Sequence, residues 1–155
     1  KGVDYWISYT YLDTKRKWVN YPKEVTPPFA ATHTASLVFK KFFTKLNVSS
    51  GFTYSYATGR PYYNPTNPDF MSDRTIDYHS LGVNAAYLRQ INRCFAVLAV
   101  SVTNVLGSTQ VFGYRYSYDW ERRSAIMPPA KRFFFIGLFL SFGQDRSKEV
   151  IDNNN

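Results

Sequence analysis

Few residues of this chain have the types and spacing that catalysis requires. His33, His79 and Cys94 are the only histidines and the only cysteine, and their separations match no zinc site. The sequence contains no glycine-rich phosphate loop and no nucleophile elbow. Spaced aspartates between residues 69 and 77 offer oxygen ligands for calcium, but this segment lacks the glycine and closing glutamate of an EF-hand loop. We therefore expect a protein that is not an enzyme and that has no catalytic residue, metal site or cofactor.

Solute binding is the chemistry that the remaining polar and aromatic residues favour. Aromatic rings stack on sugars and chelates, and guanidinium groups hold anions. Each such residue taken alone also has an ordinary role in loop packing or in anchoring at a membrane surface. The candidates for ligand binding are Trp18, Tyr21, Arg60, Tyr62, Tyr63, Tyr114, Arg115, Tyr116 and Trp120.

These candidates lie between six segments in which apolar residues alternate with small or polar ones, a period of two that predicts strands. In the last segment, Phe134, Ile136 and Leu138 share one face, whereas Val38 interrupts the alternation of the second segment. An apolar strand face must contact lipid or a second sheet. The predicted strands are Val3–Leu12, Thr34–Lys40, Val48–Ala57, Tyr78–Leu88, Phe95–Thr103 and Arg132–Phe142.

The connections between the predicted strands alternate in length. Segments 41–47 and 89–93 are short, basic and suited to hairpins, whereas 13–33, 59–77 and 104–130 are long and hold the prolines. Long loops are therefore expected at one end of the sheet and tight turns at the other. Outer-membrane barrels have this polarity, with extracellular loops and periplasmic turns, so both chain ends are expected on the periplasmic side.

Composition is consistent with strands that cross a membrane. Aromatic residues make up 19% of the chain, including 13 Tyr, which suit a surface that is apolar in the middle and wet at its ends. The longest uninterrupted apolar run, 133–140, is far shorter than the roughly 18 to 20 residues of a membrane helix. The net charge of +8 is dispersed over loops and turns, so we expect no nucleic-acid partner.

The strand faces opposite the apolar ones carry mostly Ser, Thr, Gly, Ala and Asn. Such small residues predict a wide lumen that is watery or filled by a plug, because a narrow barrel needs bulkier inward residues. Phe133, Phe135 and Phe139 depart from this pattern. We expect their rings to pack on a plug or on a loop folded into the lumen.

Three motifs together resemble the C-terminal barrel of TonB-dependent outer-membrane receptors, especially those of the Bacteroidetes. They are Arg60-Pro-Tyr-Tyr-Asn, then Val102-Thr-Asn-Val-Leu-Gly107 followed by Val111-Phe-Gly-Tyr-Arg-Tyr116, and finally Pro128-Pro-Ala-Lys-Arg-Phe-Phe-Phe-Ile-Gly-Leu-Phe-Leu-Ser-Phe142. The resemblance extends from about Tyr5 to Phe142. The order and spacing of the three motifs are together more specific than any single motif.

The last strand also resembles the barrel-insertion signal of outer-membrane proteins. Gly137, Leu140 and Phe142 occupy its glycine, apolar and terminal aromatic positions. Phe135 stands where a polar residue is usual, and residues 143–155 continue past the aromatic that commonly ends the family's chains. We therefore divide the chain into 1–142, a C-terminal part of an outer-membrane β-barrel, and 143–155, a polar C-terminal tail.

The resemblance implies an all-β fold, namely about six strands of an antiparallel, up-and-down transmembrane barrel of about 22 strands closed around a plug. It implies a receptor in the bacterial outer membrane for energy-coupled uptake of an extracellular solute. The implied partners are the rest of the barrel and its plug, TonB through an N-terminal region, the barrel-assembly machinery, and outer-membrane lipid. Basic residues such as Lys131 and Arg132 are candidates to contact the phosphates of lipopolysaccharide.

Two other interpretations remain open at this stage. In a soluble or surface β-sandwich that binds ligands or proteins, the apolar faces would form a core. In a smaller, self-assembling outer-membrane barrel with a structural role, copies of the chain would together form the barrel.

Overall fold

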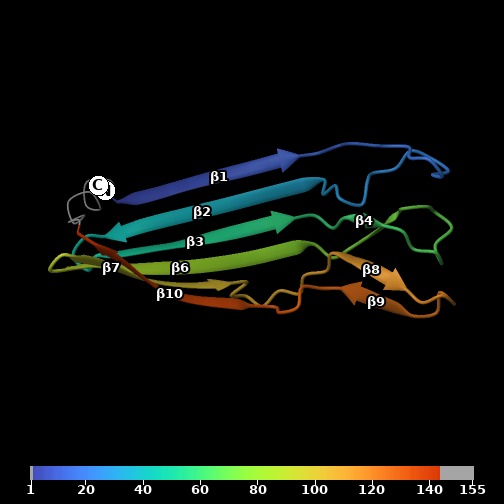
Figure 1. Cartoon of the computed structure of the whole chain (residues 1–155). Coiled ribbons are helices and arrows are strands. Elements are labelled where there is room, and N and C mark those ends of the chain that lie inside the picture. The colour runs from blue at the N-terminus through green and yellow to red at the C-terminus, as the bar shows by residue number, and fades with distance from the viewer. Residues whose placement is uncertain (1, 144–155) are drawn as a thin grey trace.

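The computed structural model describes residues 2–143 as an antiparallel sheet of six strands with short hairpins at one end (Figure 1). The order in the sheet is β1-β2-β3-β6-β7-β10, so long strands that follow one another in the chain are neighbours in space. Residues 2–143 include no helix, and therefore none that could span a bilayer. The strands are β1 Val3–Tyr11, β2 His33–Phe43, β3 Val48–Ala57, β6 Tyr78–Ile91, β7 Cys94–Thr103 and β10 Phe133–Phe142.

All six predicted strands are confirmed, and three are longer than the alternation indicated, β7 by the single residue Cys94. β2 continues to Phe43 and β6 to Ile91, which shortens both turns. Asn47 and Asn92 lie in these turns with φ of 53° and 52°. Asparagine tolerates this left-handed backbone better than most residues, which explains why the hairpins turn there.

The long connections contain two further hairpins that the sequence analysis did not predict. β4 (Pro61–Tyr62) pairs with β5 (Asp73–Arg74), and β8 (Gly113–Tyr116) pairs with β9 (Arg123–Ile126). Strands of two to four residues are too short to show an alternating pattern. Their pairing depends on contacts between residues far apart in the loop.

The register of the sheet aligns the apolar sides of all six strands into one continuous face. Ile7 on the first strand is 72% exposed and Ile136 on the last is 74% exposed, and no second sheet covers this face in residues 2–143. Val38 does not break the pattern, because it lies on the opposite face between Trp6 and Thr53. One complete apolar row is Tyr5, Phe39, Phe52, Val83, Val102 and Phe134.

The opposite face, which we call the inner face, carries the small residues. Phe133, Phe135 and Phe139 lie on it, as expected, but all three are exposed. Within residues 2–143, the expected loop does not cover these rings. Two of them lie instead against a glycine of their own strand. A Cβ at Gly137 would lie 2.7 Å from Phe135 Cζ and 3.1 Å from Phe139 Cε2, so both rings lean over this glycine.

Most of the best-buried side chains of the described chain lie in or beside the long loops, apart from Phe42 at the turn end of β2, and none lies between two layers of sheet. A β-sandwich would bury its apolar strand faces in a core, so this distribution disfavours the sandwich for residues 2–143. The sheet formed by residues 2–143 is not closed, and β1 and β10 are its two edges. The buried residues include Val25, Ala30, Ala31, Phe42, Ala57, Met71, Thr75 and Asn104.

Candidate functional site

The three long connections extend from the same end of the sheet (Figure 1). We name this region the loop cap and define it as segments 12–32, 58–77 and 104–132. The first two segments are joined by aromatic rings. The Trp18 and Tyr21 centroids are 5.3 Å apart, and Tyr21 meets Phe70 edge-on at 4.9 Å. Tyr63 lies 5.4 Å from the same Phe70 ring, so one aromatic cluster connects the first and second loops.

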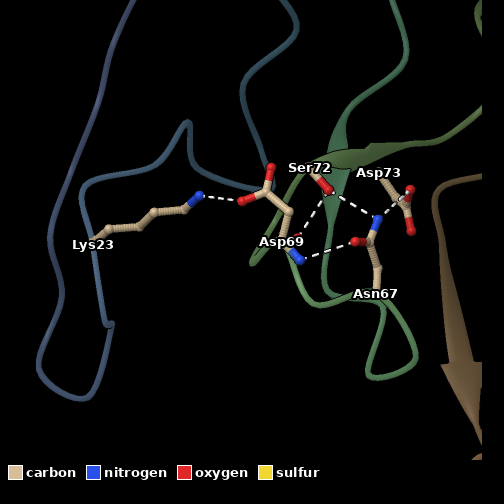
Figure 2. A network of polar contacts seen from close by, with 5 residues as sticks. All are labelled: Lys23, Asn67, Asp69, Ser72 and Asp73. Atoms are coloured by element: carbon tan, nitrogen blue, oxygen red, sulfur yellow. Dashed lines mark hydrogen bonds and ion pairs between the residues drawn. The ribbon is translucent and has the colours of Figure 1, made fainter.

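A polar network lies beside this aromatic cluster (Figure 2). Lys23 of the first loop forms an ion pair with Asp69 of the second. Asn67 accepts a hydrogen bond from the Asp69 amide at 2.9 Å and donates to Ser72 Oγ at 3.0 Å and Asp73 Oδ1 at 3.1 Å. The ion pair is exposed and contributes at most about 1 kcal/mol, so loop order here depends mainly on the hydrogen bonds and aromatic contacts.

The carboxylates of the three aspartates that suggested a calcium site are each bound to a different partner within the protein. Asp69 pairs with Lys23, and Asp73 accepts from Asn67. Asp77 accepts hydrogen bonds from the Gly59 amide at 2.8 Å and from a tyrosine hydroxyl of β3 at 3.0 Å. Within residues 2–143 no group of three His, Cys, Asp or Glu residues is placed to hold a metal ion.

A second cluster connects the second and third loops. The rings of Tyr62 and Tyr114 are 4.6 Å apart, and the Arg123 guanidinium carbon lies 4.4 Å from the Tyr114 ring centroid. Arg123 Nη1 donates to the Tyr62 hydroxyl at 2.9 Å. Burial, followed by the neighbouring Tyr116 hydroxyl, raises the pKa of Tyr62. Hydrogen bonding to Tyr116 raises the pKa of Arg123.

The structure therefore divides the nine ligand-binding candidates among different places. Trp18, Tyr21 and Tyr63 enter the first cluster, and Tyr62, Tyr114 and Tyr116 enter the second. Arg60 lines a cavity. Arg115 is exposed on β8, and Trp120 is half exposed in the β8–β9 turn; neither joins a cluster. Sequence reasoning missed Phe70 and Arg123, because only long-range contacts distinguish them from ordinary loop residues.

A cavity of about 500 Å³ lies where the inner face meets the loop cap. Its floor is formed by small hydroxyl-bearing residues of β1, β2 and β3, including Ser36 and Ser55. Arg60 and Thr75 line one side, and Val111 and Phe112 of the third loop line another. The third loop therefore reaches the inner face at this end of the sheet.

Asn104 ties together the two ends of the third loop. Its side chain is buried, and its amide nitrogen donates to the carbonyls of Ser108 at 2.9 Å and Lys131 at 2.8 Å. Its side-chain oxygen accepts from the Ser108 amide at 3.2 Å. Gly107, with φ of 66°, leaves room for the Arg132 guanidinium, which would be 2.7 Å from a Cβ there. The motif Val102–Gly107 thus closes the loop next to β7 and β10.

The residues compared with an insertion signal lie in the edge strand β10. Leu140 and Phe142 are on the apolar face, opposite Ala96 and Cys94 of β7. Gly137 is on the inner face, opposite Ala99. Of the predicted tail 143–155, only Gly143 belongs to the described residues, and its amide donates to the Arg93 carbonyl at 2.9 Å. The rest of that prediction lies outside them.

Comparisons with family models, curated proteins and solved structures find no match to this chain. The architecture and the loop cap are therefore the basis for inferring its function.

Proposed function

We propose that this chain forms part of the wall of a TonB-dependent outer-membrane receptor. The whole receptor binds an extracellular solute and imports it when energised through TonB. The observation that carries the proposal is the continuous apolar face, which the register extends over all six strands and which has no protein layer against it in residues 2–143. Acyl chains are the partner that this face requires, because its exposure to water would be costly.

The two edges of the sheet support a larger assembly. In hydrocarbon, each unsatisfied backbone group costs several kcal/mol, so β1 and β10 need further strands. We propose that the rest of a barrel of about 22 strands supplies them and surrounds a plug. The barrel-assembly machinery would insert it, and TonB would engage an N-terminal region.

The proposed function needs no bond-making chemistry from these residues, so we propose a transporter and not an enzyme. The loop cap would face the exterior, where its aromatic rings and cations meet solute and lipopolysaccharide. The turn end, with Lys45 and Arg93 in its hairpins, would face the periplasm.

The test is the location and behaviour of the full-length protein after charge is placed on either face. Leu138→Arg puts a cation on the apolar face, where it costs roughly 2–4 kcal/mol at the bilayer midplane. Ser101→Arg is the matched control, since Ser101 lies on the inner face opposite Phe135. We expect the unmodified protein and the control to fractionate with the outer membrane and to show heat-modifiable migration, and Leu138→Arg to lose both properties.

A monodisperse monomer in buffer without detergent would contradict the proposal and favour the sandwich. Equal insertion of Leu138→Arg and Ser101→Arg would contradict the assignment of the apolar face to lipid.

A further inference from the structure

We infer that the cavity at the junction of the inner face and the loop cap binds a sugar acid, a polyhydroxylated ring that carries a carboxylate. The inference rests on the proposed function, because an imported solute must pass this face of the sheet. The cavity volume of about 500 Å³ lies within the range of small-ligand sites, about 300–1,000 Å³.

The floor of the cavity is a regular array of hydroxyl groups. Ser8, Ser36 and Ser55 are register partners on three neighbouring strands, and Thr10 is the partner of Thr34 in the next inward-facing row. Neighbouring members of a row are separated by one strand spacing, about 4.8 Å. All five of these residues line the cavity. A serine or threonine hydroxyl both donates and accepts, so the array matches a ligand that presents several hydroxyls of its own.

These hydroxyl groups are available to a ligand. Within residues 2–143, the side chains of Ser8, Ser36 and Ser55 take part in none of the side-chain hydrogen bonds, and neither do those of Thr10 and Thr34. Thr58 and Thr75, which also line the cavity, are engaged instead with His33 and Arg60 backbone groups. The five hydroxyls of the array, those of Ser8, Ser36, Ser55, Thr10 and Thr34, therefore contact solvent until a bound solute displaces it.

Among residues 2–143, Arg60 is the one charged residue that lines the cavity. Its backbone is held in place: its amide donates to Thr75 Oγ1 at 3.0 Å, and its carbonyl accepts from the Thr75 amide at 2.9 Å. Its guanidinium forms no hydrogen bond or ion pair within the described chain. The nearby Asp77 carboxylate is already bound to Gly59 and Tyr56. A guanidinium without a carboxylate partner favours an anionic group, and it can bind a carboxylate through two parallel hydrogen bonds.

Val111 and Phe112 supply the apolar wall that the ring of such a solute needs. The Phe112 amide donates to the Ile126 carbonyl at 2.8 Å, which fixes this segment to β9. No carboxylate of residues 2–143 lines the cavity, so the lining of these residues does not suit a metal cation. A wholly apolar ligand would strip water from the hydroxyl groups without replacing their hydrogen bonds.

The test is calorimetric titration of the full-length protein in detergent with digalacturonate, with the neutral disaccharide galactobiose and with acetate. We expect digalacturonate to bind about tenfold or more tightly than galactobiose, and acetate not to bind measurably, because both the charge and the hydroxyls contribute. Arg60→Gln should reduce the affinity for digalacturonate to that for galactobiose. Arg93→Gln, which removes an exposed cation at the opposite, turn end of the sheet, is the matched control and should change neither affinity.

The hydroxyl array has its own matched control. Ser36→Ala combined with Ser55→Ala should weaken both disaccharides severalfold, since each lost charge-neutral hydrogen bond changes affinity by a factor of a few. Ser80→Ala should not, because Ser80 belongs to the same serine row but does not line the cavity. These substitutions remove no hydrogen bond within the described protein, so folding is expected to be retained.

Equal affinity for digalacturonate and galactobiose, equal losses in Arg60→Gln and Arg93→Gln, or no loss in the double serine variant would each overturn the inference. Absence of binding by a protein that is heat-modifiable and located in the outer membrane would also overturn it, while leaving the proposed function intact. Because location is assayed on the same preparations, the two failures are distinguishable.

Discussion

Tyr62 and Tyr63 are consecutive in the chain, yet their rings contact different loops. Tyr62 lies 4.6 Å from Tyr114 in the third loop, whereas Tyr63 lies 5.4 Å from Phe70 within the cluster that includes the first loop. Successive side chains of an extended segment point to opposite sides, which makes this division possible. The dipeptide therefore links the second loop to both of its neighbours, and the loop cap is one connected structure.

The first prediction uses these two tyrosines as matched variants. Tyr62→Phe removes the hydroxyl that accepts a hydrogen bond from Arg123, whereas Tyr63→Phe removes no hydrogen bond within residues 2–143. We expect hydrogen exchange in the β8–β9 hairpin to accelerate in Tyr62→Phe, with a local loss of about 1 kcal/mol, and to stay unchanged in Tyr63→Phe. Equal exchange in both variants would show that this hydrogen bond does not stabilise the cap.

The second prediction concerns the closure of the third loop by Asn104. Asn104→Ala leaves two part-buried carbonyls and one amide without their side-chain partner, so we expect a loss of roughly 1–3 kcal/mol in unfolding free energy. Asn84→Ala is the control, because Asn84 is exposed and its side chain has no hydrogen bond within the described residues. Thermal or denaturant unfolding in detergent measures both, and similar stabilities would contradict the role of Asn104.

The third prediction compares two glycines of the inner face. A Cβ at Gly51 would lie 2.7 Å from the Phe39 carbonyl oxygen, which cannot move without shifting the strand. A Cβ at Gly82 would meet no atom closer than 3.8 Å. We expect Gly51→Ala to cost about 1–3 kcal/mol and Gly82→Ala to be neutral or slightly stabilising. The unfolding midpoints of the two variants decide this, and the reverse order would refute the pairing of β2 with β3 in this register.

The fourth prediction is a pH dependence in the β8–β9 turn. Hydrogen bonds, first from Ser117 and then from the Glu121 amide, lower the pKa of Asp119. Because the folded pKa is below the unfolded one, the stabilisation is present above the ordinary aspartate pKa, about 3.9, and is lost as the pH falls through the folded value. The protection of the Glu121 amide, that is, its exchange rate relative to the intrinsic rate at each pH, should therefore fall in acid, and Asp119→Asn should remove that dependence. An unchanged acid response in the variant would assign the effect to another group.

The fifth prediction addresses lipopolysaccharide. The Lys131 side chain is exposed at the loop end, whereas Lys45 is exposed in the turn at the opposite end. If the loop cap faces the outer leaflet, Lys131→Gln should weaken lipopolysaccharide binding at low salt, and Lys45→Gln should not. Co-purified lipopolysaccharide per protein is the measurement. Unchanged amounts in Lys131→Gln would defeat the proposed contact.

Local pattern was sufficient to predict the strands, their faces and the two kinds of connection. The alternation from Phe134 to Phe142 needs only a period of two, and Asn47 and Asn92 mark turns by their own backbone preferences. The strand ends were less accurate, because pairing partners extended β2 and β6 beyond the alternating residues.

Only the tertiary structure decided which residues meet. The row from Ser8 to Ser55 depends on the register of three strands, and a shift of one residue would turn these hydroxyls to the other face. The contact of Arg123 with Tyr62 spans 61 residues, and Phe112 reaches the inner face from a loop without any local pattern that indicates it. Alternation is a property of a short segment and can be read from sequence, whereas register and loop contacts are set by the packing of segments that are distant in the chain.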